Sequence, residues 1–248
     1  MLFRSRLLCR LQAWFSVMSG NVYAVIDIET SGLSPRMGDG ICEIGAVVLN
    51  ERFEVERCLS LLLHPGCRMS WNAISVHRIS DAAVRDCPSF RQILPGFLSF
   101  LHGVTHLVAH NLSFETRFLN DVLCEHGVGV ADLFSTVCTM RHARSLKLAD
   151  NARLATLMQH FGIQTTFGMH AALVDAAATS MLLQKMSGSL QFPVPRGVSV
   201  PSIGSGKLCS LPDPCVSRTS ESDLRRLLQQ MSLTAARADH VVPLNSLQ

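Results

Sequence analysis

The sequence predicts an α/β domain built on a mixed β-sheet. Runs of β-branched and aliphatic residues come first, at 22–28, 41–49 and 57–63. Short turns join these runs, so they are expected to form an antiparallel meander. Two further strand-like runs alternate with helical segments, at 105–109 and 135–138. Such alternation is typical of parallel β-α units, so the sheet is expected to contain both strand directions.

Helices are expected where apolar residues recur at helical spacing. These segments are 89–102, 113–126, 139–146, 151–161 and 171–186. Gly127 and Gly162 follow two of them, as is usual at helix ends. Residues 72–80 are expected to form a loop that closes on a helix start, with Ser80 as the N-cap.

Three regions are expected along the chain. Residues 1–20 form an N-terminal extension that is either a short amphipathic helix or untranslated, with Met18 as the true start. Residues 21–187 form the compact domain. Residues 188–248 begin as a Ser/Gly/Pro-rich linker and continue into an amphipathic helix at 219–238. This helix either tethers the domain to a partner or packs back on the domain.

The net charge does not indicate a nucleic-acid-binding surface. The formal charge is +3, but Arg4, Arg6 and Arg10 account for all of it. Residues 21–186 carry 13 basic and 15 acidic residues, a net of −2. A generally basic domain is therefore excluded, and any binding of nucleic acid must depend on local geometry and metal.

The cysteine pattern and the hydropathy indicate in which cellular compartment the protein is expected. Nine cysteines are scattered singly, without a C-x-x-C pair, which disfavours a zinc site and a disulfide framework. Reduced and mostly buried thiols in the cytoplasm are expected instead. No apolar run approaches the roughly 18 residues that span a bilayer, so no membrane association is expected.

Two acids mark the end of the first strand-like run. Asp27 and Glu29 lie on one face of it, because side chains alternate along a strand. The run then breaks at a glycine turn, Thr30-Ser-Gly32. Carboxylates are the ligands that suit hard divalent cations, so this pattern predicts a metal site at the sheet edge.

Further polar groups can join this pair. His110 and Glu115 follow the 105–109 strand and open the next helix. His170 lies in a turn, and Asp175 lies in an Ala-rich helix where an acid serves no packing purpose. Strand ends and helix starts are where α/β sheets usually carry their chemistry, so these groups are expected to converge.

The combined pattern resembles a known family. Three motifs agree in order and spacing with those of the DEDDh 3′–5′ exonucleases: Asp27-Ile-Glu29-Thr30, His110-Asn-x-x-Phe-Glu115 and His170-x-x-x-x-Asp175. The resemblance covers about 21–187. Within the family, the chain looks most like the epsilon (proofreading) subunit of bacterial DNA polymerase III.

The resemblance implies a ribonuclease-H-like fold and two Mg²⁺ or Mn²⁺ ions. It implies that Asp27 bridges both ions, and that Glu29 and Asp175 hold the ion on the side of the nucleophile. His170 would orient and deprotonate the attacking water. These roles agree with general chemistry, because two metals clamp the attacking and leaving oxygens and a histidine is a suitable base near neutral pH.

One position departs from the family pattern. The second motif normally ends in Asp, and here it ends in Glu115. The extra methylene moves the carboxylate by roughly 1.5 Å, which matters for the strict octahedral geometry of Mg²⁺. Asp121 has a different helical phase and is not expected to substitute. We expect an active enzyme in which the second ion binds more weakly or Mn²⁺ is preferred.

Three residues are candidate substrate contacts. Thr30 and Leu33 follow the first motif, where the family places the 3′-terminal nucleotide, although Leu33 is equally well explained as a core residue. Asn111 is a further candidate contact. Together with His110, it is also expected to fix the strand-to-helix turn through side-chain hydrogen bonds.

The resemblance implies a metal-dependent 3′–5′ exonuclease that acts on single-stranded DNA 3′ ends. Such an enzyme would proofread with a replicative DNA polymerase, whose catalytic subunit residues 190–248 would contact. A stand-alone 3′ exonuclease on RNA or oligonucleotides stays open, because the motifs do not separate DNA from RNA. A catalytically weakened nucleic-acid- or polymerase-binding module also stays open, with Glu115 as its only support.

Overall fold

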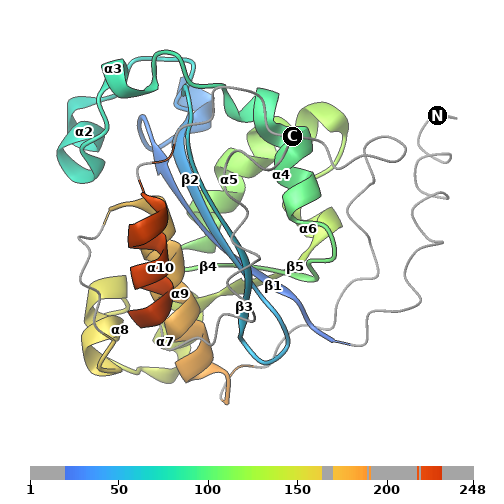
Figure 1. The fold of residues 1–248 in the computed structure, drawn as a ribbon, viewed down its shortest axis with the longest axis vertical. Helices are drawn as coiled ribbons and strands as arrows, with labels where there is room; N and C mark the ends of the chain where they lie inside the picture. Colours follow the sequence, from blue (N-terminus) through green and yellow to red (C-terminus); the bar gives the residue numbers. More distant parts are fainter. Residues whose placement is uncertain (1–19, 164–169, 189, 191–216, 218, 231–248) are drawn as a thin grey trace, which may run out of the picture.

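The computed structural model describes residues 20–163, 170–188, 190, 217 and 219–230. The expected N-terminal extension lies outside the described residues, apart from Gly20, and so does most of the expected linker. The secondary structure and its packing are described below for these residues only (Figure 1).

A five-stranded mixed sheet forms the centre of the domain, as predicted. Its strands are β1 (Tyr23–Thr30), β2 (Ile41–Leu49), β3 (Val55–Leu62), β4 (His106–Ala109) and β5 (Ser135–Cys138). Their order in the sheet is β3-β2-β1-β4-β5. β1, β2 and β3 pair antiparallel, whereas β1 with β4 and β4 with β5 pair parallel. The meander followed by β-α units therefore places β1 at the centre of the sheet.

Helices cover both faces of the sheet (Figure 1). The α-helices are α2 (Trp71–His77), α3 (Asp81–Val84), α4 (Phe90–Phe100), α5 (Leu112–Leu123), α6 (Val130–Leu133), α7 (Thr139–Leu146), α8 (Leu154–His160), α9 (Ala172–Met186) and α10 (Glu221–Gln230). Two short 3₁₀ helices are η2 (Pro35–Met37) and η3 (Cys124–His126). All the helices expected from apolar spacing are present within a few residues of the expected bounds.

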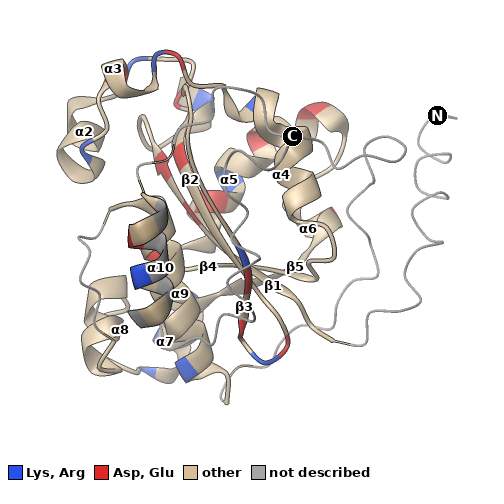
Figure 2. Ribbon diagram, in the orientation of Figure 1, with Lys and Arg blue, Asp and Glu red and all other residues tan. Residues whose placement is uncertain are grey.

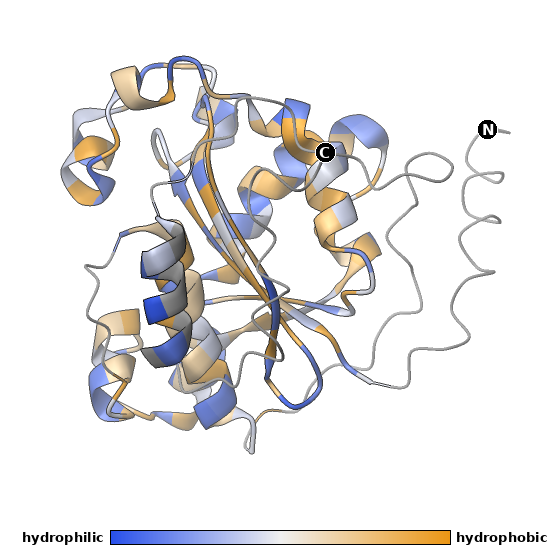
Figure 3. Ribbon diagram, viewed as in Figure 1, coloured by the Kyte–Doolittle hydropathy of each residue, from blue (hydrophilic) through white to orange (hydrophobic). Residues whose placement is uncertain are grey.

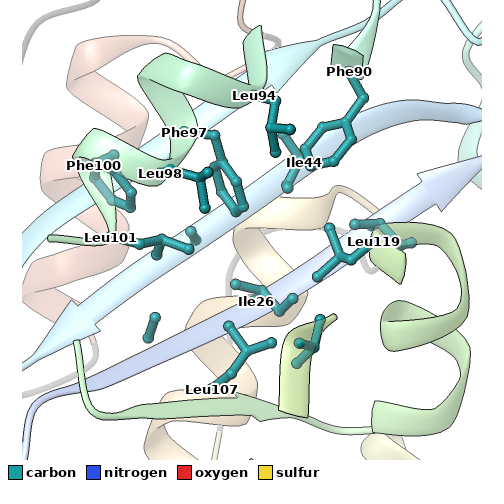
Figure 4. Packing of buried hydrophobic residues seen from close by; sticks show 14 of the residues in the cluster. Ile26, Ile44, Phe90, Leu94, Phe97, Leu98, Phe100, Leu101, Leu107 and Leu119 are labelled. Atoms are coloured by element: carbon teal, nitrogen blue, oxygen red, sulfur yellow. The ribbon is translucent and has the colours of Figure 1, made fainter. Parts of the chain in front are cut away.

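Two hydrophobic cores lie on opposite faces of the sheet. The first joins the sheet to α4 and α5, and Figure 4 shows Phe90 and Phe97 of α4 over the strand that carries Ile44. The second joins the sheet to α7, α8 and α9. Figure 3 shows the hydrophobic strands between these two layers. Burial of apolar surface on both faces accounts for the largely apolar sequences of the central strands.

The alternation of β1 decides where its acids lie. Ile26 and Ile28 point into the first core, whereas Val25 points into the second. Asp27 and Glu29 follow Val25 at positions +2 and +4, so they lie on the face covered by α9. The predicted single face for the two acids is therefore present, and it is the face toward the Ala-rich helix.

The expected loop at 72–80 is wrong, because most of it is the helix α2. Ser70 caps this helix by accepting a hydrogen bond from the backbone N–H of Ala73 at 3.1 Å. α2 buries only His77, so its sequence lacks the apolar periodicity that predicts helices. The expected cap at Ser80 is confirmed, since its side chain accepts from Ala83 N at 3.3 Å and opens α3.

The C-terminal helix α10 lies on α9. Leu227 is buried there in the second core. The helix was expected at 219–238, and residues 231–238 lie outside the described part. α10 therefore packs back on the domain through at least one buried leucine, which is one of the two arrangements considered from sequence.

The described cysteines are all free thiols. Cys42 and Cys58 are buried, while the other four are partly or fully exposed, so burial is less general than expected. No described helix is both long and apolar enough to cross a membrane.

Candidate active site

The site begins where α9 passes over β2. Gly45 lies opposite Asp27 in the β1–β2 pairing. A Cβ atom at Gly45 would collide with the backbone of Ala172 and Leu173. A glycine here therefore lets the first turn of α9 approach the sheet beside Asp27, and this approach carries Asp175 to the site.

Glu43 anchors the same turn, and sequence reasoning missed it. Its side chain is fully buried, and its Oε2 accepts a hydrogen bond from the backbone N–H of Ala172 at 3.1 Å. Glu43 pairs with Glu29 across the β1–β2 ladder. The available signal was a single acid inside an otherwise apolar strand, because a buried carboxylate is rarely retained without a polar partner.

Glu29, His170 and Asp175 converge beside this anchor. One ligand atom from each lies within 4.8 Å of the others. The three side chains come from β1, the turn before α9 and the first turn of α9. Glu29 and His170, which are 141 positions apart in the sequence, therefore lie close together, and the three motifs were expected to converge in this way.

The raised pKa of Asp27 places this residue near the other acids of the cluster. The pKa of its carboxyl is raised well above the usual value, first by burial and then by the charges of Asp175, Glu115, Glu29 and Glu43. These four acids are therefore close enough to Asp27 to oppose its ionisation. Figure 2 shows this gathering of acidic residues at one end of β1 and β2 and on α5. Protonation or a bound cation relieves the repulsion between like charges held so close.

Glu115 reaches the cluster from α5. Its side chain is 3% exposed, and burial raises its pKa to about 8, although a hydrogen bond from its own backbone N–H opposes this rise. Its Oε2 is buried and has no hydrogen-bond partner within the described part of the chain. Asp121 is exposed and lines a different hollow, of about 310 Å³, with Asp39 and Arg91, so it does not substitute for Glu115.

The cluster fits divalent metal ions. A buried carboxylate oxygen without a partner is costly unless a cation or donor meets it, and Glu115 Oε2 is such an atom. The charges of four further acids act on Asp27. An all-oxygen set with one histidine at its edge suits Mg²⁺ or Mn²⁺ better than a softer metal.

The backbone of His170 is fixed in an uncommon conformation. Its φ of 71° lies in the left-handed region, where non-glycine residues are rare. Its N–H donates to Asp175 Oδ2 at 3.1 Å, which stabilises this turn at the start of α9. The side chain is exposed, so its ring borders solvent at the mouth of the cluster.

His110 has the expected structural role, but its side chain ties the β4–α5 turn to distant residues rather than bonding within the turn. Its Nε2–H donates to the carbonyl of Ala152 at 2.9 Å, and its Nδ1 then accepts from the hydroxyl of Thr139 at 2.9 Å. Burial lowers the pKa of His110, which favours this neutral form. Asn111 does not cap the helix; its Oδ1 accepts from the hydroxyl of Ser113 instead, at 3.1 Å.

The two candidate contacts after β1 differ in exposure. Thr30 is buried, and its hydroxyl donates to the carbonyl of Gly32 at 2.6 Å. Leu33 is 77% exposed, so its reading as a core residue is wrong. Arg117 of α5 donates to the carbonyl of Leu33 at 3.1 Å and holds this loop against the helix that carries Glu115.

The chain is similar in sequence to known exonucleases and DNA polymerase III proteins. The family model described as RNase_T, Exonuclease, matches residues 24–183. DNA polymerase III subunit epsilon of Rickettsia conorii (strain ATCC VR-613 / Malish 7) is 30% identical over 171 residues, which cover 67% of this chain and 74% of that protein. The PolC-type DNA polymerase III of Caldanaerobacter subterraneus subsp. tengcongensis is 33% identical over 171 residues, or 68% of this chain and 12% of that protein.

Solved structures share the fold. Exonuclease X in complex with 5′ overhanging duplex DNA has a TM-score of 0.57 and 25% identity, and the match covers 73% of this chain and 99% of that chain. The nuclease domain of 3′hExo, a DEDDh family member bound to rAMP, has a TM-score of 0.58 and 18% identity, covering 73% and 100%. The ribonuclease-H-like sheet expected from the three motifs is thereby confirmed.

Proposed function

Because the chain belongs to this exonuclease family and is a 3′–5′ exonuclease, we propose that it uses divalent metal ions to remove nucleotides from single-stranded DNA 3′ ends. We further propose that it proofreads with a replicative DNA polymerase, since DNA polymerase III subunits are among its relatives. The observation that carries the proposal is the convergence of Asp27, Glu115 and Asp175 on one sheet end, with His170 at its edge.

Each residue of the cluster would have a separate role in hydrolysis. Asp27, Glu29, Glu115 and Asp175 would hold two Mg²⁺ or Mn²⁺ ions, which supply charge neutralisation at the phosphate and a lowered pKa for bound water. His170 would take a proton from the attacking water as its oxygen bonds to phosphorus. The bond from phosphorus to the 3′-oxygen of the preceding nucleotide would then break, and that oxygen would take a proton from solvent. The products would be a nucleoside 5′-monophosphate and a strand one nucleotide shorter with a free 3′-hydroxyl.

Substrate placement would use the loop after β1. Leu33 is exposed in the loop after β1, and Arg117 holds its carbonyl, so its side chain would contact the terminal base. Thr30 is buried and engaged with Gly32, so its contact would come through the loop backbone it supports. Asn111 is half-buried at the start of α5 and remains a candidate contact with the terminal nucleotide.

A degradation assay tests the proposal. Single-stranded DNA and RNA of one sequence, 5′-labelled to resolve a ladder, are incubated with Mg²⁺, with Mn²⁺ or with chelator. We expect stepwise shortening of DNA from the 3′ end with either metal, none with chelator, and none with Asp175→Asn. Shortening of DNA that continues in chelator, or that persists in Asp175→Asn, would contradict the metal-dependent site.

The same assay separates the alternative functions. Equal or faster degradation of RNA would favour the stand-alone ribonuclease, because a 2′-OH contact is what distinguishes the two substrates. No degradation of either, together with retained binding, would favour a weakened binding module. In that case Glu115→Asp should restore shortening, since Glu115 is where the chain departs from the family pattern.

The partner is tested by co-purification with a polymerase catalytic subunit. Deleting 190–248 should abolish the association if this region is the tether. Two point variants of α10 refine this test. Leu227→Ala removes the side chain that is buried against α9, and Arg226→Ala removes an exposed side chain of the same helix. Loss of association only in Leu227→Ala would mean that the docked helix is needed, and loss only in Arg226→Ala would mean that the exposed side chain contacts the polymerase.

A further inference from the structure

Trp71 is the most exposed aromatic side chain in the described part of the protein. It is 80% exposed at the first position of α2. Three other large apolar side chains are exposed in the same part of the chain or in the loop after β1: Leu33, Met37 and Val76. A tryptophan left in water is unusual for a side chain of this size, and apolar groups gathered around a site often mark a binding surface.

Two hydrogen bonds tie α2 to the strand that carries the acids. The backbone N–H of Ser70 donates to the carbonyl of Ser31 at 2.8 Å. The buried His77 accepts from Ile79 N at its Nδ1, so its Nε2 carries the proton and donates to the carbonyl of Thr30 at 3.3 Å. Trp71 is one residue from the first of these bonds, and Glu29 is two residues from Ser31. The tryptophan is therefore held near the metal-binding acids.

The charge of this region is opposite to that of the acid cluster. Four arginines are exposed here, and none has a carboxylate partner among the described residues: Arg36, Arg68, Arg78 and Arg85. Two of the nearby acids are engaged with backbone: Asp39 accepts from Ser34 N at 2.9 Å and Asp81 accepts from Met69 N at 3.0 Å, whereas Asp86 is exposed beside Arg85. Figure 2 shows basic residues at the end of α2 and beside α3, where acidic residues also lie.

We infer that Trp71 is a stacking platform for a base upstream of the 3′-terminal nucleotide, with the neighbouring arginines facing the phosphates. The inference rests on the proposed function. Single-stranded nucleic acid is the occupant because an exposed aromatic beside unpaired arginines is the combination that binds it without sequence preference. A scissile end held at Glu29 and Asp175 leaves the next nucleotides to cross this surface.

Intrinsic fluorescence tests the contact without turnover. Trp14 and Trp71 are the two tryptophans of the chain, so Trp14→Phe leaves Trp71 as the sole reporter. In chelator, a ten-residue oligo(dT) should quench this emission saturably, and dTMP should quench it far less. Equal quenching by dTMP, or none by the oligonucleotide, would overturn the inference; absence of quenching is also the outcome expected if a protein occupies this surface.

Kinetics separate this inference from the proposed function. With metal, Trp71→Ala should raise KM for the ten-residue substrate by about 5- to 150-fold with kcat changed little, and Trp71→Phe should restore most of the loss. Leu146→Ala, which removes another exposed apolar side chain on α7, is the matched control. An active parent with an unchanged Trp71→Ala KM would refute the platform alone. An inactive parent would refute the proposed function, and the fluorescence titration would then decide the platform.

Discussion

The carboxylate of Glu43 accepts a hydrogen bond from the backbone N–H of Ala172, and this bond fixes the first turn of α9 to the centre of the sheet. Asp175 lies in the same turn, three residues after Ala172, and its Oδ2 accepts from His170 N. Two residues of the acid cluster thus depend on a buried acid that need not touch the substrate. Glu43 is a positioning residue for both.

Glu43→Gln and Glu43→Leu should therefore differ. Glutamine keeps an acceptor oxygen for Ala172 N–H, whereas leucine leaves that buried donor unsatisfied, which costs about 1–3 kcal/mol of unfolding free energy. We expect Leu to lower both the midpoint of urea unfolding and kcat, and Gln to keep the midpoint. A leucine variant with the stability and activity of the parent would show that the bond anchors nothing.

Gly45→Ala should disable the site through the backbone alone. The new methyl group would collide with Ala172 and Leu173, so α9 must move away from Asp27. Misplacement by about 1 Å can reduce a rate by about 100-fold, and we expect kcat to fall at least that far. Gly188→Ala is the matched control, because a Cβ there meets nothing. Similar activity in the two variants would contradict the close approach.

The sequence predicted the parts of the site that have a local signature. Asp27 and Glu29 lie at the end of a strand-like run, and Asp175 interrupts an Ala-rich helical segment, so both patterns can be recognised in the sequence alone. Glu43 and Gly45 were not singled out, because their roles arise only when β2 meets α9. A single strand does not reveal which helix crosses it, since packing partners are set by tertiary structure.

The helix α2 escaped prediction for a related reason. Amphipathic spacing reports burial, and α2 buries only His77. The cap at Ser70 was the available local signal. Exposed helices have little apolar periodicity, because few of their side chains pack against a core. The same exposed helix contains Trp71.

The metal-free protein should lose stability as the pH rises. The pKa of Glu115 is raised from 4.5 to about 8. Below pH 4.5 the carboxyl is protonated in both states, so it contributes no pH dependence. Between about pH 4.5 and 8 the unfolded chain releases this proton and the native state keeps it, so the free energy of unfolding falls by up to roughly 1.4 kcal/mol per pH unit.

Urea unfolding in chelator across this range measures the effect. Glu115→Gln should flatten part of the slope, and the raised pKa of Asp27 leaves the remainder with the same sign. Saturating Mn²⁺ should reverse the trend, because metal binding favours the deprotonated ligands. Identical slopes in the parent and Glu115→Gln would contradict the buried protonated state.

Removing Leu227 should loosen α10 without harming the site. Its side chain is buried in the core beside α9, and truncating a buried leucine to alanine costs about 2–5 kcal/mol where the helix is coupled to global unfolding. Leu227→Ala should raise protease sensitivity near residue 220 while kcat on short DNA is retained. Arg226→Ala, which is exposed on the same helix, should leave the cleavage rate as in the parent.

His170→Asn tests the proposed base while keeping its backbone. The φ of 71° is tolerated by asparagine better than by most side chains, so the bond from residue 170 N to Asp175 should survive. Loss of the imidazole should lower kcat by about 10²- to 10⁴-fold, the usual contribution of a general base, with KM changed little. His170→Gly, which relaxes the backbone completely, should be equally slow, whereas a defect of the turn alone would be rescued by glycine. Substantial activity in either variant would show that another group takes the proton.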